Sequence, residues 1–406
     1  MLDAVIIGGG AAGMAAAIAA GMLGERTLVL ERMDRVGKKL LATGNGRCNL
    51  MNIGPLRYPG GAALAQAVLA RCGAAEQTAF WRHWGLSLRT EDGGRVYPAS
   101  GQASTVLDTL RLAMAATGAQ IVTGAAVTGI RYDGGLFTVA AGGQSWQARR
   151  VIVAGGGCAQ PKLGSDGSAW GLLEPFGHAL LAPRPSLTQI MTDPAPIRGL
   201  SGIRARCRVA VLRGVKTLHE ESGELLFADY GVSGVCVMQC ARWAEPGCEL
   251  RLDLTRGMGF ESEAALAEEL RRRRALFAGH PAEQLLTGLC VPRLAACLLK
   301  AAGIRREESI DCLADGSLDR LADVMAGFRL EVRGVKGFDS AQVTAGGLDA
   351  GGFHPDTLES LYQPGLHACG EMLDVDGDCG GYNLMFAFGS GLLAGLNGRE
   401  MPWRKA

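Results

Sequence analysis

The start of the chain has an apolar pattern typical of a strand–helix–strand unit. Residues 2–7 form a short, almost continuously apolar run, which favours a buried parallel strand. An alanine-rich stretch then extends to about residue 23 and predicts a buried helix. Residues 27–30 are apolar again and predict a second strand, which ends at Glu31. The pattern therefore predicts a βαβ unit at the N-terminus.

The pattern between residues 61 and 154 predicts both helices and strands. Two helical stretches fall within residues 61–88, and residues 104–117 predict an amphipathic helix. Three short apolar runs follow and are expected to form a small antiparallel meander, with a turn at residues 133–135. These runs are residues 121–123, 127–132 and 136–139. Residues 150–154 predict another buried strand.

From about Pro185 the composition changes to alternating and charged segments. Four segments predict antiparallel strands, with one turn at Ser222 and Gly223. These segments are residues 207–212, 216–220, 224–228 and 249–254. Residues 261–325 are helical and charged, and residues 328–333 return as a strand. The helical segment is therefore expected to be an insert within a β-rich insert.

Composition narrows the possible classes of protein. The 406 residues include 41 basic and 40 acidic side chains, a net charge of +1 that argues against nucleic acid as the main partner. The 12 cysteines form no C-x-x-C pair, and neither they nor the histidines have metal-ligand spacing, so no metal is expected. The chain starts directly in a strand and has no run long enough for a membrane span, so a cytoplasmic protein with reduced thiols is expected. The oligomeric state is not fixed by these features.

Glycines stand between the first strand and the first helix at the spacing of a dinucleotide-binding turn. Gly8 allows the tight turn, Gly10 lets the backbone approach a pyrophosphate, and Gly13 lets helix and strand pack closely. The helix N-terminus offers free N–H groups and the positive end of a dipole. Glu31 is placed to accept hydrogen bonds from the adenosine ribose, which argues against a 2′-phosphate.

The loop over residues 32–52 is rich in glycine, amide and cationic side chains. In a FAD protein this segment passes over the diphosphate and the isoalloxazine ring. Lys38 and Arg47 could meet phosphate charge or an anionic flavin, and Asn45 and Asn49 could meet the ring edges.

Seven segments spread over the chain resemble one known family. They are residues 37–49 (GKKLLATGNGRCN), 92–98, 161–165, 230–234, 344–347, 370–377 and 380–384. Together they resemble the BaiN/RdsA-type NAD(P)/FAD-dependent oxidoreductases. Residues 154–160 depart from the usual pattern of that family, which affects local substrate contacts more than FAD binding. The resemblance implies a FAD-bound Rossmann domain with two inserted domains.

The resemblance and the glycine pattern together give an α/β fold with defined domains. Residues 1–185 and 337–406 are expected to form the FAD-binding Rossmann domain. Residues 186–254 and 326–336 are expected to form the β-rich insert, and residues 255–325 its small helical insert. The expected cofactor-binding residues are Gly8, Gly10, Ala11, Ala12, Gly13, Glu31, Arg32, Lys38, Thr43, Gly44, Asn45, Arg47, Cys48, Asn49, Val127, Ala154, Gly155, Gly370, Glu371, Asn383, Leu384 and Met385.

The C-terminal part is expected to complete the cofactor site. Residues 364–370 predict a strand that ends at Glu371, and Gly380 and Gly381 open a final helix over residues 383–396. The N-terminus of this helix should point at the flavin pyrimidine edge, where reduced flavin carries negative charge. Since the sequence has no second glycine fingerprint, NAD(P)H is expected only as a transient electron donor.

The expected function is FAD-dependent oxidoreduction of a small molecule. The resemblance implies reduction of a C=C bond conjugated to a ketone, in a 3-oxo steroid or a compound like a dehydro bile acid. Tyr382 is the expected proton donor, with Arg47 as an electrostatic partner, and water is the other proton source considered. Two alternatives are a flavin oxidase of a small amine or aminoketone, and a FAD-bound redox sensor or binding protein without turnover.

Overall fold

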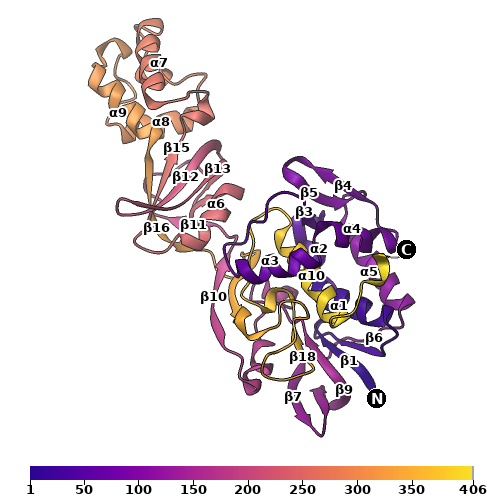
Figure 1. Cartoon of the computed structure of the whole chain (residues 1–406). Coiled ribbons are helices and arrows are strands. Elements are labelled where there is room, and N and C mark those ends of the chain that lie inside the picture. The colour runs from indigo at the N-terminus through magenta and orange to yellow at the C-terminus, as the bar shows by residue number, and fades with distance from the viewer. Residues whose placement is uncertain (405–406) are drawn as a thin grey trace. The chain divides into compact units, whose positions relative to one another are not determined.

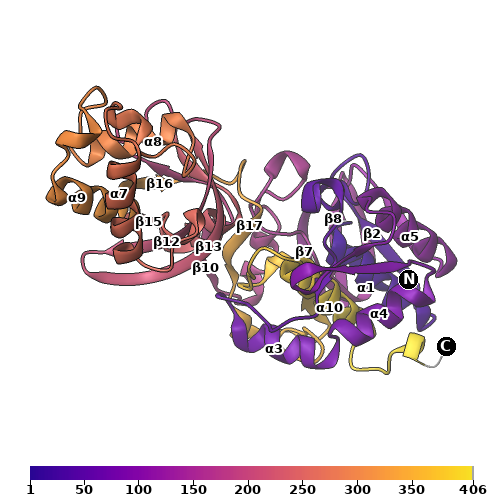
Figure 2. The ribbon, with the colours of Figure 1, turned by 90° about the horizontal axis from the view of Figure 1, so that it is seen from above.

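The computed structural model describes residues 1–404 and divides into two compact units (Figures 1 and 2). The first unit combines residues 1–185 with the described residues from 342 onward. The second unit is the continuous segment Ser186–Ala341. Each unit has its own hydrophobic core. No helix within residues 1–404 is long and apolar enough to cross a membrane.

A seven-stranded sheet is the centre of the first unit. Its order is β6–β2–β1–β9–β8–β7, and β18 pairs with β9. Strands β6, β2, β1, β9 and β18 are parallel, whereas β8 and β7 are added by antiparallel hairpins. The strands are β1 (Leu2–Ile7), β2 (Thr27–Leu30), β6 (Gln120–Val122), β7 (Val127–Asp133), β8 (Leu136–Ala141), β9 (Gln144–Val153) and β18 (Leu366–Ala368). The predicted α/β Rossmann fold is confirmed.

The prediction that residues 121–123 belong to the antiparallel meander is wrong. Strand β6 pairs in parallel with β2, with Leu28 opposite Gln120 and Leu30 opposite Val122. The helix α5 (Ala103–Ala116) comes directly before β6, and a helical connection returns the chain in parallel. A run of three residues is too short to indicate which strand it will pair with.

Helix α10 (Tyr382–Leu396) packs against helix α1 (Ala11–Met22) through small residues. A Cβ atom at Gly391 would lie 2.3 Å from the carbonyl oxygen of Ala12, and one at Gly395 would lie 2.4 Å from that of Ala16. Glycine therefore lets these helices approach more closely than any other residue would. Further helices of this unit are α2 (Lys38–Ala42), α3 (Ala62–Arg71) and α4 (Ala74–His83).

Two smaller sheets complete the first unit. The order of the three-stranded sheet is β3–β5–β4, built from β3 (Met51–Asn52), β4 (Leu88–Glu91) and β5 (Arg95–Pro98). Strand β10 (Leu180–Ser186) pairs with β17 (Val343–Leu348) at the two points where the chain leaves and re-enters this unit.

The second unit is a closed six-stranded barrel with helices packed on a shared core. The barrel order is β11–β14–β13–β12–β15–β16. Its strands are β11 (Ile190–Thr192), β12 (Arg204–Arg213), β13 (Lys216–Ala228), β14 (Gly231–Ser233), β15 (Glu249–Asp253) and β16 (Phe328–Val335). Its helices are α6 (Val235–Cys240), α7 (Glu263–Leu276), α8 (Pro292–Ala301) and α9 (Asp315–Ala326).

The turn predicted at Ser222 and Gly223 is wrong. Strand β13 runs through both residues without interruption, with Gly223 opposite Cys207 in β12. A Cβ atom at Gly223 would lie 3.1 Å from that of Cys236 in α6, so the glycine allows close helix packing rather than a turn. The chain reverses instead at Gly214 (φ +60°), between Arg213 and Lys216.

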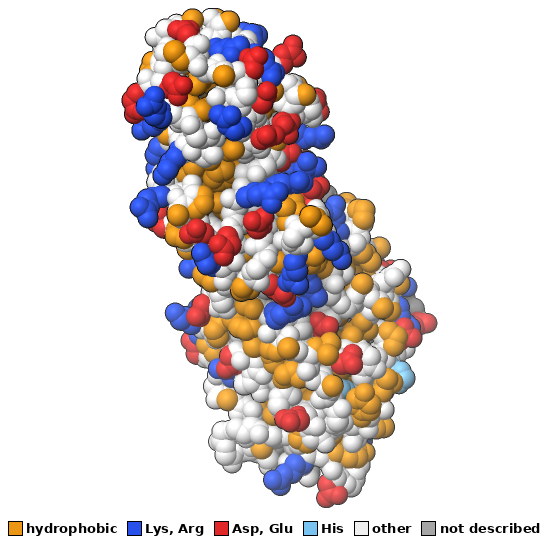
Figure 3. Space-filling view, turned by 90° about the vertical axis from the view of Figure 1, so that its left-hand side faces the viewer, with side chains coloured by type: hydrophobic (Ala, Val, Ile, Leu, Met, Phe, Trp, Pro, Cys, Tyr) orange, Lys and Arg blue, Asp and Glu red, His pale blue; other side chains and the backbone are white. Residues whose placement is uncertain are grey.

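Charges of both signs are interspersed on the face of the second unit that Figure 3 shows. In this unit, several charged side chains are paired between neighbouring strands. Arg204 of β12 lies 2.7 Å from Glu224 of β13, and Arg329 of β16 lies 2.7 Å from Glu249 of β15. Basic and acidic side chains, which are nearly equal in number in the sequence, therefore also lie close to one another on these strands.

Candidate cofactor site

The glycine turn after β1 divides into residues that pack the protein and one that leaves space. Gly8 has φ +102°, and a Cβ atom there would lie 2.4 Å from the carbonyl oxygen of Ala154. A Cβ atom at Gly13 would lie 1.8 Å from the carbonyl oxygen of Gly8. By contrast, one at Gly10 would meet none of the described atoms within 4 Å. Gly10 caps the N-terminus of α1, so the open space lies where a diphosphate would meet free helix amides.

The side chain of Glu31 is hydrogen-bonded to this turn. Its buried carboxylate accepts hydrogen bonds from the backbone N–H of Gly9 and of Met33, each at 2.7 Å. Each carboxylate oxygen has a second lone pair, so Glu31 can still accept a ribose hydroxyl. The adjacent Arg32 points elsewhere, toward Asp166 and Ser168. Glu31 therefore has a structural role besides the predicted contact with ribose.

Two neighbouring lysines in α2 have different surroundings. The ammonium group of Lys38 lies 2.6 Å from the exposed Asp34. That of Lys39 lies 2.6 Å from Glu371, three residues after the end of β18. Sequence reasoning selected Lys38 and missed Lys39, which reaches the carboxyl ends of the parallel strands, where ligands bind in sheets of this kind.

Glu371 joins several segments that lie far apart in the sequence. It accepts a hydrogen bond from the backbone N–H of Thr344 at 2.8 Å. The Thr344 hydroxyl in turn accepts from the backbone N–H groups of Cys158 and Ala159, at 2.8 and 3.1 Å. Ser165 donates to the carbonyl oxygen of Gly157 at 3.0 Å. Segments 37–49, 161–165, 344–347 and 370–377 therefore meet at one place.

The loop over residues 43–49 has an unusual backbone. Gly44 and Asn45 are both left-handed, with φ of 56° and 55°. Thr43 donates its hydroxyl proton to the carbonyl oxygen of Leu40. Cys48 is buried, which raises the pKa of its thiol to about 12. A neutral thiol of this kind is a poor nucleophile.

Arg47 is held by the three-stranded sheet. Its guanidinium lies 2.5 Å from Glu91 and 4.2 Å from the centre of the Tyr97 ring. Its charge is therefore already partnered within the protein, and the predicted electrostatic role would share it with Glu91.

Helix α10 begins with a polar cradle. Gly380 and Gly381 have positive φ, and the first intrahelical bond runs from Met385 N–H to the carbonyl oxygen of Gly381 at 3.0 Å. The backbone N–H groups of residues 382–384 thus have no partner inside the helix. The Asn383 side chain both accepts from and donates to the backbone of Gly377, so it shapes the preceding loop. Leu384 and Met385 complete the first turn of the helix.

Tyr382 is buried at the same helix start. Its hydroxyl donates to the carbonyl oxygen of Pro55 at 3.0 Å, and burial raises its pKa. Its ring meets that of Tyr58 edge to face, at 5.8 Å between centres. The hydroxyl therefore has a hydrogen-bond partner within the protein.

The remaining predicted contacts lie along the strand ends and the first turn of α1. Ala154 and Gly155 follow β9, and the Ala154 N–H donates to the carbonyl oxygen of Ile7 at 2.8 Å. Gly370 follows β18 and donates its N–H to the Ser390 hydroxyl at 2.9 Å. Ala11 and Ala12 form the first turn of α1, and Val127 begins β7.

The family model for the HI0933-like protein Rossmann domain matches residues 2–397. The chain belongs to this HI0933-like family. The resemblance inferred from the seven segments is thereby confirmed. The family-wide match also fits the convergence of four of those segments around Glu371.

The HI0933-like chain has full-length relatives with named activities. It is 37% identical over 409 residues to a 3-dehydro-bile acid delta(4,6)-reductase of Clostridium scindens, covering 98% of this chain and 99% of the relative. It is 28% identical to a ribosomal RNA dihydrouridine synthase of Haemophilus influenzae, covering 97% of each chain. A solved 3-ketosteroid-delta4-(5alpha)-dehydrogenase of Rhodococcus jostii is 17% identical, with a TM-score of 0.48 and coverage of 98% and 97%. The HI0933-like chain is a FAD-dependent oxidoreductase.

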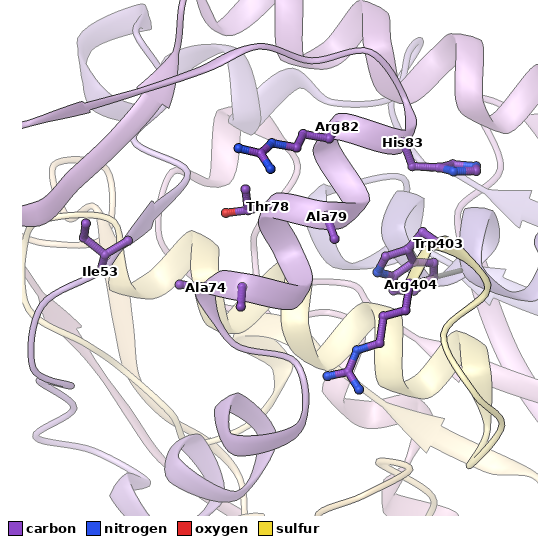
Figure 4. A pocket seen from close by; sticks show the side chains of 9 residues that line it. Ile53, Ala74, Thr78, Ala79, Arg82, His83, Trp403 and Arg404 are labelled. Atoms are coloured by element: carbon purple, nitrogen blue, oxygen red, sulfur yellow. The ribbon is translucent and has the colours of Figure 1, made fainter. Parts of the chain in front are cut away.

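A surface cavity of about 800 Å³ lies on a different part of the first unit (Figure 4). Ala74, Thr78, Arg82 and His83 of α4 line it, together with the C-terminal Trp403 and Arg404 and nearby apolar residues. None of the predicted site residues contributes to it. Within residues 1–404, no group of three potential ligands could hold a metal ion.

Proposed function

We propose that this HI0933-like protein reduces a C=C bond conjugated to a ketone in a 3-oxo steroid or a compound like a dehydro bile acid. NAD(P)H would supply the electrons. The observation that carries the proposal is 37% identity over nearly the whole chain to a 3-dehydro-bile acid delta(4,6)-reductase. The ribosomal RNA dihydrouridine synthases are more distant relatives, at 28% and 27% identity.

The activities named for the two kinds of relative share one chemistry. The steroid alkene is conjugated to a 3-ketone, and the C5=C6 bond of uridine is conjugated to the C4 carbonyl. In both cases hydrogen is added across a C=C bond that a neighbouring carbonyl activates. This shared chemistry supports the reaction class, and the higher identity supports a steroid rather than an RNA substrate.

Two independent observations support FAD as the ligand, one at the glycine turn and one at Asn49. The space in front of Gly10 would accept a diphosphate, which a Cβ atom there would obstruct. A buried amide oxygen of Asn49 has no hydrogen-bond partner among residues 1–404 and needs a donor from outside the protein. FAD, when bound, supplies hydride-transfer chemistry at its ring. The protein would hold it through the α1 N-terminus, Glu31 and the segment after β18.

The proton that completes the reduction is proposed to come from water. Tyr382 was the side chain expected to give it, but its hydroxyl is bonded to the Pro55 carbonyl and burial raises its pKa. Tyr382→Phe should therefore cost about 1 kcal/mol of stability, as for one lost hydrogen bond. It should leave the turnover number within about twofold, since the hydroxyl takes no part in the chemistry. Steady-state kinetics at saturating substrate, beside urea unfolding, would separate the two effects.

The function can be tested by anaerobic incubation with a substrate panel. The full-length holoprotein is mixed with NADH or NADPH and with 3-oxo-4-ene and 4,6-diene steroids, and products are analysed by mass. A gain of two hydrogens in at least one steroid is expected. The same protein freed of flavin, and an incubation without pyridine nucleotide, are the controls.

Two other results would overturn the proposal. The first is a gain of two hydrogens only in uridine of an RNA fragment, with no steroid product. The second is reduction of the flavin by an aminoketone, followed by reoxidation with oxygen. A protein that holds FAD yet turns over nothing in the panel would instead favour the sensor or binding role.

A further inference from the structure

The side chain of Asn49 has an open hydrogen-bonding position inside the protein. Its amide oxygen is buried and accepts no hydrogen bond from any residue between 1 and 404. Buried polar atoms in native proteins almost always have a partner, because losing water without a replacement costs free energy. A donor from outside the polypeptide is therefore expected at this oxygen.

The open position lies beside the N-terminus of α10. The Asn49 oxygen is 2.7 Å from where a Cβ atom of Gly381 would stand, so glycine at the helix cap leaves room for it. The helix amides of residues 382–384 open at the same place. One acceptor thus stands next to several free donors.

Two other asparagines near this helix start are fully occupied. Asn52 donates to the carbonyl oxygens of Gly93 and Gly380 and accepts from the N–H of Gly54. Asn383 accepts from the N–H of Gly377 and donates back to its carbonyl. Both have structural partners for donor and acceptor, and only the Asn49 oxygen among these three side chains stays open.

The pyrimidine edge of a flavin has the complementary pattern. It presents one N–H donor, at N3, between two carbonyl acceptors. We propose that the Asn49 amide oxygen accepts the N3–H of the flavin, while the α10 amides meet the neighbouring carbonyl. This inference rests on the proposed FAD site. It assigns Asn49 as the residue that recognises the N–H group at N3 of the flavin.

The test is a cycle that combines a protein variant with a flavin variant. Apoprotein of the full chain is prepared in two forms, unmodified and Asn49→Leu, which has similar volume and no acceptor. Each is titrated with FAD and with N3-methyl-FAD, which lacks the N3–H, and binding is followed by flavin absorbance and fluorescence. Gln147→Leu is the matched control, because it makes the same change from an amide to leucine at an exposed position of β9 outside the expected cofactor-binding residues.

The unmodified protein should bind N3-methyl-FAD about 10-fold or more weakly than FAD, which corresponds to one lost buried hydrogen bond. Asn49→Leu should bind FAD weakly to a similar extent and should not distinguish the two flavins. Gln147→Leu should behave as the unmodified protein. Equal binding of both flavins by the unmodified protein would overturn this inference alone, as would a methyl effect that persists in Asn49→Leu. Failure of the unmodified apoprotein to bind FAD at all would overturn the proposed function as well.

Discussion

The three glycines of the first turn have two kinds of neighbourhood. Gly8 and Gly13 face backbone atoms that exclude any side chain, whereas Gly10 faces open space at the head of α1. A fixed sequence spacing therefore contains both packing and binding requirements. Substitution by alanine can separate them.

Gly13→Ala and Gly10→Ala should affect different properties of the protein. The Cβ atom of Gly13→Ala would lie 1.8 Å from a backbone oxygen, so we expect a loss of about 3 kcal/mol or more in stability. Gly10→Ala should leave the unfolding free energy of the apoprotein nearly unchanged and weaken FAD binding by about 1–3 kcal/mol through steric conflict. Urea unfolding of apoprotein and flavin titration measure the two effects. Equal destabilisation by both substitutions would contradict the assignment of Gly10 to the ligand.

Glu31→Ala should weaken FAD binding by about 1–3 kcal/mol, as expected for a lost charged hydrogen bond. It should also lower the stability of the apoprotein, because the amides of Gly9 and Met33 lose their buried acceptor. Glu31→Gln keeps one acceptor oxygen and should lie between the two proteins in both measurements. An unchanged FAD affinity in Glu31→Ala would exclude the ribose contact.

At the residue scale, the sequence was sufficient to select residues whose role follows from their spacing along the chain. It was not sufficient where the role depends on the direction in which a side chain points. Gly8, Gly10 and Gly13 could be assigned because a strand, a turn and a helix leave one arrangement for them. Lys39 could not be separated from Lys38, because adjacent helical residues point about 100° apart and the sequence does not say which faces inward. Nor could it place Glu371 beside Thr344, a contact that depends on the tertiary fold.

At the scale of elements, α1 and α10 cross at a distance that only glycine permits. Gly391→Ala would place a Cβ atom 2.3 Å from the Ala12 carbonyl oxygen, so we expect a loss of about 1–3 kcal/mol. Gly171→Ala is the control, since its Cβ would meet none of the described atoms within 4 Å. Thermal and urea unfolding should separate these two variants clearly. Similar stabilities would mean that the helices can move apart without cost.

The other end of α10 is closed by one buried arginine. Arg150 donates to the carbonyl oxygens of Ala394 and Gly395, each at 2.8 Å, and lies 2.5 Å from Glu25. Arg150→Met would leave Glu25 and two helix carbonyls without this partner, so we expect a loss of about 3–5 kcal/mol. Arg150→Lys keeps the charge but not the planar fork, and its stability should fall between the two. A urea-unfolding midpoint that does not change in Arg150→Met would contradict this role.

The pairing of strands could be predicted only where the connection between two strands leaves one usual arrangement. The βαβ unit was correct because a short loop and one helix leave a parallel neighbour as the usual outcome. Strand β6 was assigned to the wrong partner because three residues carry no pairing information. Gly223 was read as a turn because glycine is common in turns, whereas its reason here is the helix packed above it.

At the scale of the whole molecule, acid stability should depend on one buried histidine. His367 is fully buried in the first unit, and its Nε2 lies 3.1 Å from the amide oxygen of Asn397. Burial and the nearby Arg150 lower its pKa from 6.5 to about 4. The neutral form is therefore the folded form, and its contribution to stability is present above pH 6.5. It is lost as the pH falls toward 4, because the unfolded chain takes up the proton first.

Unfolding free energy should accordingly fall by on the order of 1 kcal/mol per pH unit across that window. Urea unfolding at pH 7.5, 6.0 and 5.0 measures the slope. His367→Gln, which cannot be protonated, should flatten it. A slope that is the same in both proteins would assign the pH dependence to other groups, such as His178, whose pKa burial also lowers.

The first unit is assembled from two stretches of chain, and residues 186–341 are synthesised between them. During translation the glycine turn leaves the ribosome early, but β18 and α10 follow only after the barrel is complete. At about 5–20 residues per second, synthesis of residues 186–341 takes roughly 8 to 31 s. The barrel unit is continuous in sequence and has its own hydrophobic core, so it can fold during this time. Helix α1 cannot pack against α10 until α10 has been synthesised. We therefore expect FAD to bind only after β18 and α10 have been synthesised, because both contribute to the proposed site.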